Sequence, residues 1–342
     1  MKALLYMAVL GAALLGAAPA AAAAATPATI VRPDYLLVHF TDGRADGEQI
    51  YFSTSRDGYR WQDLNGGQPV LTSNVGDRGV RDPSIIRTRD GKFYILATDL
   101  RIANGKGWEA AKHRASTYIV IFESADLVHW SAPRLVDIAG GIAQAGCAWA
   151  PEAIYDDDTG DYLVYWTTFS PANGHDKARI YAARTRDFVT FTPAQPYIDR
   201  PGAQGLIDTQ IVDAGPGAGA YRYYRASGDG QITIEGSNAL TGSWQRLGDL
   251  AAIGLTGQEV EGPILFRLAA SGEWGLWVDQ YRSRAGYLAL ATADLSRPQT
   301  LRRVDPARIA YGATKKRHGS ILNISAEEYQ RVLARWPAAP AP

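Results

Sequence analysis

The sequence has very little sulfur chemistry and no excess of charge of either sign. Of its 342 residues only Cys147 is a cysteine, so an internal disulfide is excluded. Cys147 lies among small residues just before Trp149, and we expect it to be a buried bystander rather than a nucleophile. The 35 basic and 35 acidic residues cancel and no long basic run exists, which leaves nucleic-acid binding without electrostatic support.

Long apolar runs are also scarce, and the one present lies at the N-terminus. A short positive start, Met1-Lys2, precedes an apolar stretch and a run of alanines with small-residue cleavage motifs. This is typical of a secretory signal peptide, so we expect residues 1–25 to be removed and the chain to be exported, to the periplasm or out of the cell. No later segment is apolar enough to span a bilayer.

What the sequence has in quantity is short β-type repeats, each opening with an acidic residue or a histidine. The five openings are separated by roughly 50–70 residues, a period typical of propellers, in which one small sheet cannot bury its own faces. The first four openings each precede a turn and a second strand-like run. The repeat-leading residues are Asp82, Glu152, Asp208, Glu261 and His318.

The first and last repeats are each incomplete, which indicates how the ring closes. The N-terminal segment has strand-like runs at 35–40 and 49–55 but no acid-led opening, and the last opening, at His318, has no hairpin after it. We therefore predict that 320–324 joins the N-terminal strands in one composite blade, because closure of this kind leaves only short, protected sheet edges.

The predicted fold is all-β, a five-bladed β-propeller closed by a composite blade of N-terminal and C-terminal strands. One catalytic domain is expected over residues 26–336, and its last residues, 326–336, have the pattern of a short helix. The Pro- and Ala-rich end, 337–342, is expected to be a loose tail. We expect the protein to be a monomer.

In a propeller the first strand of each blade lines the axis, so the five repeat-leading residues are predicted to face one central funnel. Gathering four carboxylates costs free energy through repulsion and desolvation, which favours a chemical role over a stabilising one. Two facing carboxyl groups can cleave a glycosidic bond, one by protonating the leaving oxygen and the other by activating water. The alternative is that individual acids bind backbone N–H groups at strand starts.

The ordered set of motifs resembles glycoside hydrolase family 43, five-bladed propeller enzymes that act on arabinose- and xylose-containing polysaccharides. The resemblance covers most of the chain after residue 25. The motifs follow the family's order and approximate spacing, and they are Arg81-Asp82-Pro83-Ser84-Ile85, Trp149-Ala150-Pro151-Glu152, Ile207-Asp208, Glu261-Gly262-Pro263 and Arg317-His318-Gly319-Ser320.

The resemblance implies a role for several of these residues. Asp82 is implied as the general base, Asp208 as the residue that tunes and orients the acid, and Glu261 as the general acid of an inverting mechanism. His318 matches the axial histidine that in many members lies beside a calcium or other small ion, through water, and a hydrogen-bonding histidine at the hub is the alternative. Glu152 stands where the family often has aspartate, and we predict that it contacts substrate. No other cofactor is implied.

Sugar rings need aromatic surfaces and hydrogen-bonding partners near the acids. Trp149, Trp108 and Tyr281 lie next to hub or loop motifs and are predicted to contact sugar, with core packing as the alternative. Arg282, just after the second strand of the fourth repeat, is predicted to bind sugar hydroxyls, with a solvated loop arginine as the alternative.

These features predict an exported, exo-acting, inverting glycosidase whose substrate is an oligo- or polysaccharide that contains arabinose or xylose. α-L-Arabinofuranosidase is the first expectation, β-xylosidase the next, and an exo-β-galactosidase of the same family is a further alternative. Two other classes stay open: a retaining, invertase-like propeller hydrolase, and a carbohydrate-binding propeller without catalysis. The former shares an arginine–aspartate–proline motif but needs an earlier aspartate nucleophile, and the latter does not need an acid–base pair.

Overall fold

Short strands make up nearly all of the structure, a computed structural model that describes residues 33–338 except 43, 45, 218, 229–230 and 257–259. The predicted signal peptide and the last four residues of the predicted tail lie outside the described residues. The described part of the chain belongs to one compact unit. None of its helices is long and apolar enough to cross a membrane.

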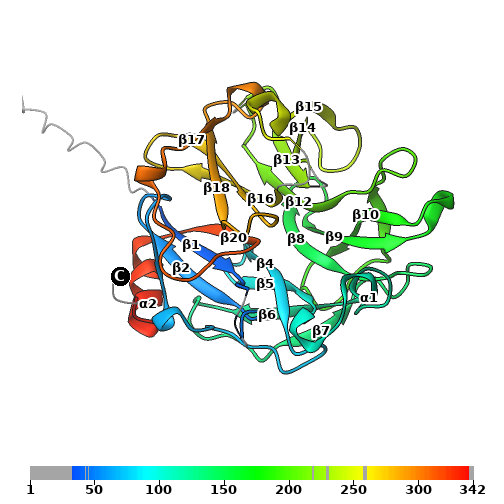
Figure 1. The fold of residues 1–342 in the computed structure, drawn as a ribbon, viewed down its shortest axis with the longest axis horizontal. Coiled ribbons are helices and arrows are strands. Elements are labelled where there is room, and N and C mark those ends of the chain that lie inside the picture. The colour runs from blue at the N-terminus through cyan, green and yellow to red at the C-terminus, as the bar shows by residue number, and fades with distance from the viewer. Residues whose placement is uncertain are drawn as a thin grey trace, which may run out of the picture. The chain divides into compact units, whose positions relative to one another are not determined.

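The strands form five antiparallel sheets of four strands each, which are the blades of a propeller (Figure 1). Blade 2 consists of β4 (Val80–Arg87), β5 (Phe93–Asp99), β6 (Tyr118–Ser124) and β7 (Arg134–Asp137), and blade 3 of β8 (Trp149–Asp156), β9 (Asp161–Ser170), β10 (Lys177–Thr185) and β11 (Gln195–Ile198). Blade 4 consists of β12 (Ile207–Asp213), β13 (Tyr223–Gly228), β14 (Thr233–Ser237) and β15 (Gln245–Asp249), and blade 5 of β16 (Glu261–Leu268), β17 (Glu273–Asp279), β18 (Tyr287–Thr292) and β19 (Arg302–Arg303).

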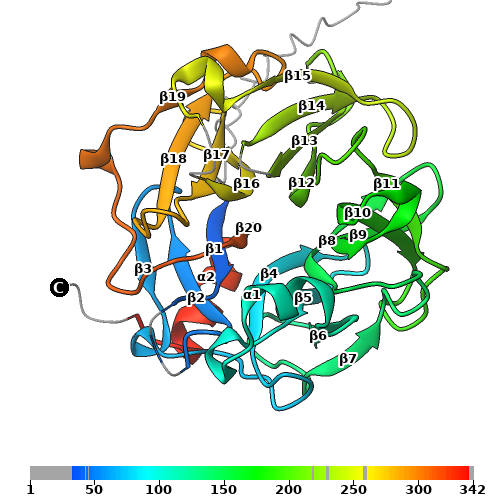
Figure 2. The same cartoon turned by 45° about the vertical axis from the view of Figure 1, so that its right-hand side comes forward.

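Blade 1 is assembled from both ends of the described chain, as the incomplete repeats predicted. Its strands are β20 (Gly319–Ile324), β1 (Asp34–His39), β2 (Tyr51–Ser55) and β3 (Trp61–Asp63), in that order from the axis. The first two pair antiparallel along the full length of β1, and Figure 2 places β20 beside it. This pairing closes the ring and confirms the predicted five-bladed architecture.

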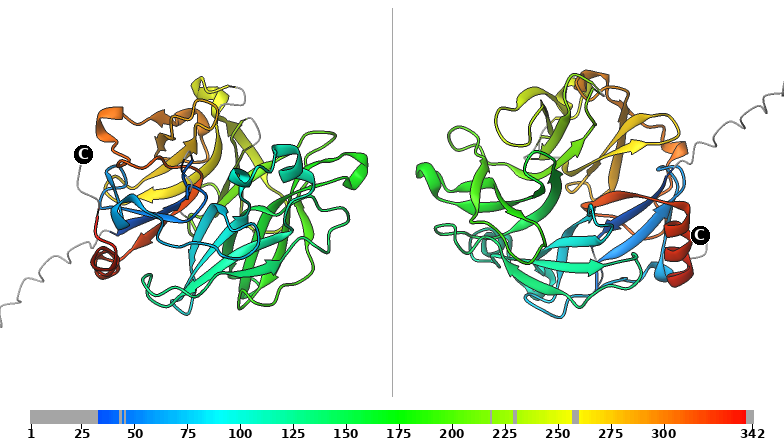
Figure 3. Two further views of the ribbon diagram at one scale, coloured as in Figure 1. Left: turned by 60° about the horizontal axis from the view of Figure 1, so that its bottom comes forward. Right: turned by 180° about the vertical axis from the view of Figure 1, so that it is seen from behind.

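A helix covers the outside of blade 1. Helix α2 (Ala326–Arg335) begins at Ser325, whose side chain accepts from the backbone N–H of Glu328 in a capping box. Tyr329 and Val332 pack into the same hydrophobic cluster as strands of blades 1 and 2. Figure 3 shows α2, in red, against the outer side of the blue N-terminal strands.

The hydrophobic core is divided into five layers, one between each pair of neighbouring blades. In β1, Leu36 and Val38 pack toward blade 2, whereas Tyr35 and Leu37 pack toward blade 5. Successive side chains of a strand point to opposite faces, and each blade lies between two others, so both faces are buried. Cys147 is buried as expected, and burial raises the pKa of its thiol to about 12.

Candidate active site

Each inner strand of blades 2–5 carries a β-bulge next to the axis. In β4 the pairing register shifts between Arg81 and Ser84, and the same shift recurs in β8, β12 and β16. Bulges change the direction in which side chains point. Positive φ costs free energy in residues other than glycine, so the surrounding fold must hold these bulges in place. The residues with positive φ are Asp82 (48°), Ala150 (45°), Asp208 (51°) and Gly262 (54°).

The repeated bulge defines three rings of equivalent positions around the axis, with one member from each inner strand or the residues just before it. The first ring consists of Arg81, Trp149, Ile207, Glu261 and Arg317, all of which line one pocket. The second ring consists of Asp82, Ala150, Asp208, Gly262 and His318. The third ring, two residues further along, consists of Ser84, Glu152, Gln210, Ile264 and Ser320.

These rings correct the expectation that the four acids and the histidine occupy equivalent positions. Glu152 belongs to the third ring, whose side chains link neighbouring blades. It accepts a hydrogen bond from Gln210 Nε2 at 3.3 Å, and Ser84 Oγ likewise donates to Pro151 O at 2.6 Å. Burial raises the pKa of Glu152 to about 8. Glu152 lies two residues beyond the bulge at Ala150 and is not among the residues that line the pocket, so its contact with substrate stays a prediction.

In the second ring, His318 lies between two carboxylates. Its Nδ1 is 3.5 Å from Asp82 Oδ1 and 3.6 Å from Asp208 Oδ2. The imidazole packs over Gly262, where a Cβ atom would lie 2.5 Å from the ring. Burial disfavours the charged ring, but Asp208, Asp82 and Glu261 outweigh burial and raise the pKa of His318 to about 10. The ring is therefore an imidazolium at neutral pH.

The resemblance implied that His318 lies beside a calcium or other small ion, and the charge of its ring affects how it can interact with one. An imidazolium donates from both ring nitrogens and has no lone pair for a cation. Among the residues from 33 to 338 that are described, no group of three or more His, Cys, Asp or Glu is arranged to hold a metal. The contacts of His318 with Asp82 and Asp208 fit the alternative, a histidine that bonds the hub carboxylates, and a position beside an ion, reached through water, stays a prediction.

Asp82 is held in its ionised form. Burial alone would raise its pKa, but the hydrogen bond and charge of His318, the charge of Arg81 and a hydrogen bond from Thr98 lower the pKa of Asp82 below its ordinary value. Thr98 Oγ1 donates to Asp82 Oδ2 at 3.0 Å and accepts from the N–H of Ala150 at 2.7 Å. An ionised carboxylate of this kind can accept a proton from water.

The pKa of Glu261 is shifted in the direction opposite to that of Asp82. Burial and the negative charges of Asp208, Asp279 and Asp82 raise the pKa of Glu261 to about 8, against the opposing charge of Arg317. Its side chain is 25% exposed, so the carboxyl group remains reachable from the pocket. At neutral pH the site therefore holds a protonated and an ionised carboxyl group, the two states that an acid and a base require.

Asp208 lies between these two groups. Its Oδ2 accepts from the N–H of Gly262 at 3.1 Å, which ties it to the residue after Glu261. Burial and the charge of Asp82 raise the pKa of Asp208 to about 6, while His318 opposes the rise. The structure thus brings together Asp82, Asp208, Glu261 and His318 as predicted, and it leaves their roles as predictions.

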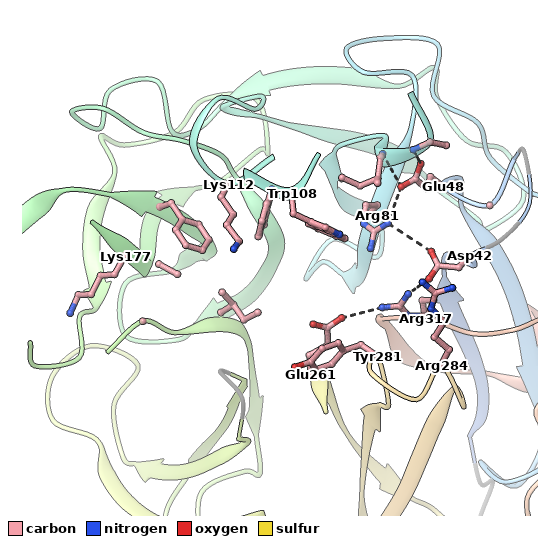
Figure 4. Close-up of a pocket in the computed structure, with 18 of the residues that line it drawn as sticks. Asp42, Glu48, Arg81, Trp108, Lys112, Lys177, Glu261, Tyr281, Arg284 and Arg317 are labelled. Carbon is pink, nitrogen blue, oxygen red and sulfur yellow. Dashed lines mark hydrogen bonds and ion pairs between the residues drawn. The ribbon is translucent and has the colours of Figure 1, made fainter. Parts of the chain in front are cut away.

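The hub opens into a pocket of about 1120 Å³ that residues of all five blades line (Figure 4). Binding sites for drug-sized ligands usually have volumes of roughly 300–1,000 Å³. The pocket therefore has room for more than one sugar ring next to Glu261.

One wall of the pocket is aromatic. Trp108 begins helix α1 (Trp108–His113), is 51% exposed, and has its ring centroid 6.3 Å from that of Trp149. The Trp149 ring in turn lies 5.5 Å from Phe169. Trp149 Nε1 is buried and has no hydrogen-bond partner in the described part of the chain. The structure brings both predicted tryptophans to the pocket and adds Phe169, which the sequence did not single out.

A chain of ion pairs adjoins this aromatic wall, since the Arg81 guanidinium lies 5.3 Å from the Trp108 ring centroid. Arg81 Nη1 lies 2.8 Å from Glu48 Oε1 and 3.9 Å from Asp42 Oδ1. Arg317 also pairs with Asp42, and its Nη2 lies 3.1 Å from Glu261 Oε1. Figure 4 draws this network from Glu48 to Glu261. Asp42 and Glu48 come from the β1–β2 connection, and no local motif indicated that this loop reaches the pocket.

The structure does not bring Arg282 into this pocket. Arg282 lines a separate cavity of about 410 Å³ together with Val260 and Leu288. Its neighbours Tyr281 and Arg284 line the main pocket instead, in the turn after β17. Tyr281 is thus placed as predicted, and the arginine of this turn that lines the pocket is Arg284 rather than Arg282.

A protonated and an ionised carboxyl group held on the axis of a five-bladed propeller define the class: a sugar-cleaving propeller hydrolase. Comparison with known families agrees. The sequence model of a family related to glycosyl hydrolase family 43, described as a probable glycosyl hydrolase domain, matches residues 32–330, so the chain belongs to this family and is a glycosyl hydrolase.

Individual known proteins are similar to parts of the chain. An α-L-arabinofuranosidase of Bifidobacterium longum is 32% identical over 237 residues, which are 63% of this chain and 21% of the relative. The chain thus matches only about a fifth of that curated relative's length. The catalytic domain of a family 62 α-L-arabinofuranosidase from Coprinopsis cinerea superimposes with a TM-score of 0.51 at 12% identity, over 73% of this chain and 76% of that one, and shows the shared fold.

An exo-β-1,3-galactanase of Clostridium thermocellum gives a TM-score of 0.49 at 13% identity, over 68% of this chain and 51% of that one.

Proposed function

We propose that this protein is an exo-acting, inverting α-L-arabinofuranosidase. The observation that carries the proposal is that the pKa values of two hub carboxyl groups are shifted in opposite directions: the pKa of Asp82 is lowered, and that of Glu261, which lines the pocket, is raised to about 8. The sugar specificity is supported by the arabinofuranosidase of Bifidobacterium longum, which shares 32% of its residues with this chain over the aligned region.

The proposed reaction uses these two groups on opposite faces of the sugar. Glu261 donates its proton to the glycosidic oxygen as the bond to the anomeric carbon breaks. Asp82 takes a proton from a water molecule, whose oxygen attacks the anomeric carbon from the other face. The product leaves with inverted configuration, and the proton on Asp82 returns to Glu261 through solvent before the next turnover.

The other hub residues set these protonation states. The charge of Asp208 helps to keep the proton on Glu261, and the His318 imidazolium keeps Asp82 ionised. Trp108 and Trp149 offer aromatic faces on which sugar rings stack.

We further propose that the enzyme is exported and works on arabinose-containing oligo- or polysaccharides outside the cytoplasm. The support is the composition of residues 1–25, a positive start followed by an apolar stretch and small-residue cleavage motifs. Expression of the full chain, followed by N-terminal sequencing of the protein from culture medium and periplasm, tests this. A mature N-terminus after residue 20–25 supports export, and an intact N-terminus in the cytoplasm overturns it.

The test of function is release of p-nitrophenol from the α-L-arabinofuranoside, the β-D-xyloside and the β-D-galactoside, with the anomeric configuration of the first-formed sugar followed by NMR. We expect turnover of the arabinofuranoside with inversion. Asp82→Asn should lower kcat by at least about a hundredfold, as loss of a general base does. Asp158→Asn, at an exposed turn, is the matched control.

Each other outcome replaces a stated part of the proposal. Retention of configuration would assign a covalent, invertase-like mechanism, and turnover of only the xyloside or galactoside would replace the sugar. Full activity of Asp82→Asn would remove Asp82 as the base. Binding of arabino-oligosaccharides without any hydrolysis would contradict the proposed activity.

A further inference from the structure

The pocket wall carries more positive than negative side chains. At neutral pH one of its acids, Glu261, is mostly protonated because burial and neighbouring carboxylates raise its pKa to about 8. The cationic lining residues are Arg44, Arg81, Lys112, Lys177, Arg284 and Arg317, and the acidic ones are Asp42, Glu48, Asp176 and Glu261. A neutral sugar does not require this excess of positive charge.

Nearly all of these cations have a carboxylate partner. Arg81 pairs with Glu48, and Arg317 pairs with Asp42 and Asp279. The remaining three pair with acids outside the lining: Arg44 with Asp46 at 3.2 Å, Lys112 with Glu109 at 3.2 Å, and Lys177 with Asp199 at 2.8 Å.

Arg284 is the exception. Within the described residues it makes no hydrogen bond and no ion pair, although it is exposed at the pocket. Figure 4 draws it on the same wall as Asp42 and Arg317, whose charges already satisfy one another. A guanidinium group without a partner, beside a filled network, is free to bind an anion from solution.

The turn that carries Arg284 is held at both ends. Gln280 binds the carbonyl of Gly286 through its backbone N–H at 2.9 Å and through its side chain at 3.2 Å. Ser283 Oγ donates to the carbonyl of Gln280 at 3.3 Å. Arg284 itself has a φ of 56°, a conformation that costs free energy for a residue other than glycine. The Arg284 side chain thus extends from a turn that hydrogen bonds hold in place.

A second cation lies close by. Lys315 is half-buried and likewise has no ion pair or hydrogen bond in the described part of the chain. Burial and the positive charges of Arg317 and Arg284 lower its pKa, while Asp42 and Asp279 oppose that effect. Two like charges held near one another repel, and they gain free energy when an anion binds near both.

We propose that Arg284 is a specificity residue that binds an anionic sugar, one with a carboxylate or sulfate group, linked next to the arabinofuranose that the enzyme releases. The proposal rests on the proposed function, and it names the substrate class of that site. A guanidinium forms two parallel hydrogen bonds with a carboxylate or sulfate, which gives orientation as well as affinity. The pocket volume leaves room for this second ring beside Glu261.

The experiment uses three matched disaccharides, in which arabinofuranose is linked to glucuronic acid, to a sulfated glucose or to glucose. We expect kcat/KM to be about tenfold higher for at least one anionic substrate than for the neutral one, the order of a charge-assisted hydrogen bond at an exposed site. The preference should shrink with added salt. The two anionic substrates distinguish a carboxylate from a sulfate as the natural group.

The variants isolate the guanidinium. Arg284→Gln should abolish the ratio of anionic to neutral kcat/KM, and Arg284→Lys should restore part of it. Arg282→Gln is the matched control, because Arg282 is an arginine of the same turn that lines the separate cavity. Its ratio should equal that of the wild type.

Equal rates on all three substrates, or a preference that survives in Arg284→Gln, would overturn the proposal. If no arabinoside is cleaved, the proposed function fails. Calorimetric titration of the same disaccharides then decides separately whether Arg284 binds an anionic sugar. Tighter binding of an anionic disaccharide by wild type than by Arg284→Gln supports an anionic-sugar site, and equal binding removes it.

Discussion

Two buried groups of charged residues, one inside blade 1 and one at the axis, contain a histidine each and behave in opposite ways. In blade 1, Lys316 Nζ bonds Asp63 Oδ1 at 2.5 Å and Thr314 O at 3.0 Å, and the N–H of Thr314 donates to Asp63 Oδ2 at 2.7 Å. His39 Nδ1 donates to the carbonyl of Phe40 at 3.0 Å. We call Asp63, Lys316 and His39 the closure cluster, because it joins β3 to the segment leading into β20.

The hub cluster, Asp82, Asp208, Glu261 and His318, has three carboxyl groups around one imidazolium. Burial and the neighbouring charge of Lys316 lower the pKa of His39 to about 3, whereas carboxylates overcome burial and raise that of His318 to about 10. Burial alone lowers the pKa of both histidines; Lys316 adds to this effect at His39, and the hub carboxylates reverse it at His318. A cluster with matched charges stabilises the fold, and a cluster with excess carboxyl groups holds a proton that it can transfer.

The largest expected effect separates activity from stability at the hub. Glu261→Gln should lower kcat by about 10²- to 10⁴-fold, as loss of a general acid does. Its free energy of unfolding should change by less than about 1 kcal/mol, because glutamine replaces a carboxyl group that is protonated at neutral pH. Steady-state kinetics and urea unfolding measure the two effects.

The matched control for this substitution is Glu327→Gln, on the exposed side of α2, which should change neither quantity. Wild-type kcat in Glu261→Gln would show that the hub proton is not used in the reaction.

The closure cluster should show the reverse behaviour. Lys316→Met leaves the Asp63 carboxylate buried without its partner, and loss of one member of a buried pair costs about 3–5 kcal/mol of unfolding free energy. The double variant Asp63→Leu with Lys316→Met should recover much of this loss, since no buried charge remains. Urea unfolding of the three proteins measures it, and a loss below about 1 kcal/mol in Lys316→Met would contradict the proposed role in ring closure.

A smaller effect tests the coupling inside the hub. Activity should fall as the pH rises through about 8, because Glu261 must carry a proton to act as the acid. Asp208→Asn removes a negative charge that raises the pKa of Glu261, so the alkaline limb of kcat/KM should move to lower pH by about one unit. The pH–rate profile of Asp158→Asn is the control, and an unmoved limb in Asp208→Asn would show that Asp208 does not tune the acid.

The smallest effect concerns acid stability. The folded protein keeps His39 neutral down to about pH 3, whereas an unfolded chain protonates histidine near its ordinary pKa of 6.5. Protons therefore favour unfolding, and the contribution of His39 is complete above 6.5 and lost as the pH falls toward 3. Between pH 7 and 5, wild type should lose up to about 2 kcal/mol more than His39→Gln.

Urea unfolding at both pH values measures this difference, and equal losses would contradict it. His318 has the opposite sign. Its stabilising contribution is complete below 6.5 and is lost as the pH rises toward 10, so it adds nothing to acid unfolding.

Much of the fold followed from local patterns in the sequence. The acid-led repeats and the two incomplete ends predicted five blades and the pairing of β20 with β1, because a strand-like run without a partner must find one elsewhere. The positions of Asp82, Asp208, Glu261 and His318 at the axis followed from the same repeats.

The sequence did not predict which of the three rings along the axis each hub residue occupies. Asp82 and Glu152 both lead a repeat, yet Asp82 lies at the bulge of β4 and Glu152 lies two residues beyond the bulge of β8. The spacing carried a usable signal, since Arg81-Asp82 and Arg317-His318 share a register in which Glu152 does not fit. In the same way the turn after β17 presents Arg284 rather than Arg282 to the pocket.

The sequence by itself determined the repeats, the ring closure and which acids reach the axis, because these depend on strand period and on partners one blade away. Only the tertiary structure decided which carboxyl group holds the proton. The pKa of Glu261 depends on burial and on Asp208, Asp279, Asp82 and Arg317, which are distant in sequence. Those charges meet because the ring closes, and no local pattern records the distances at which they meet.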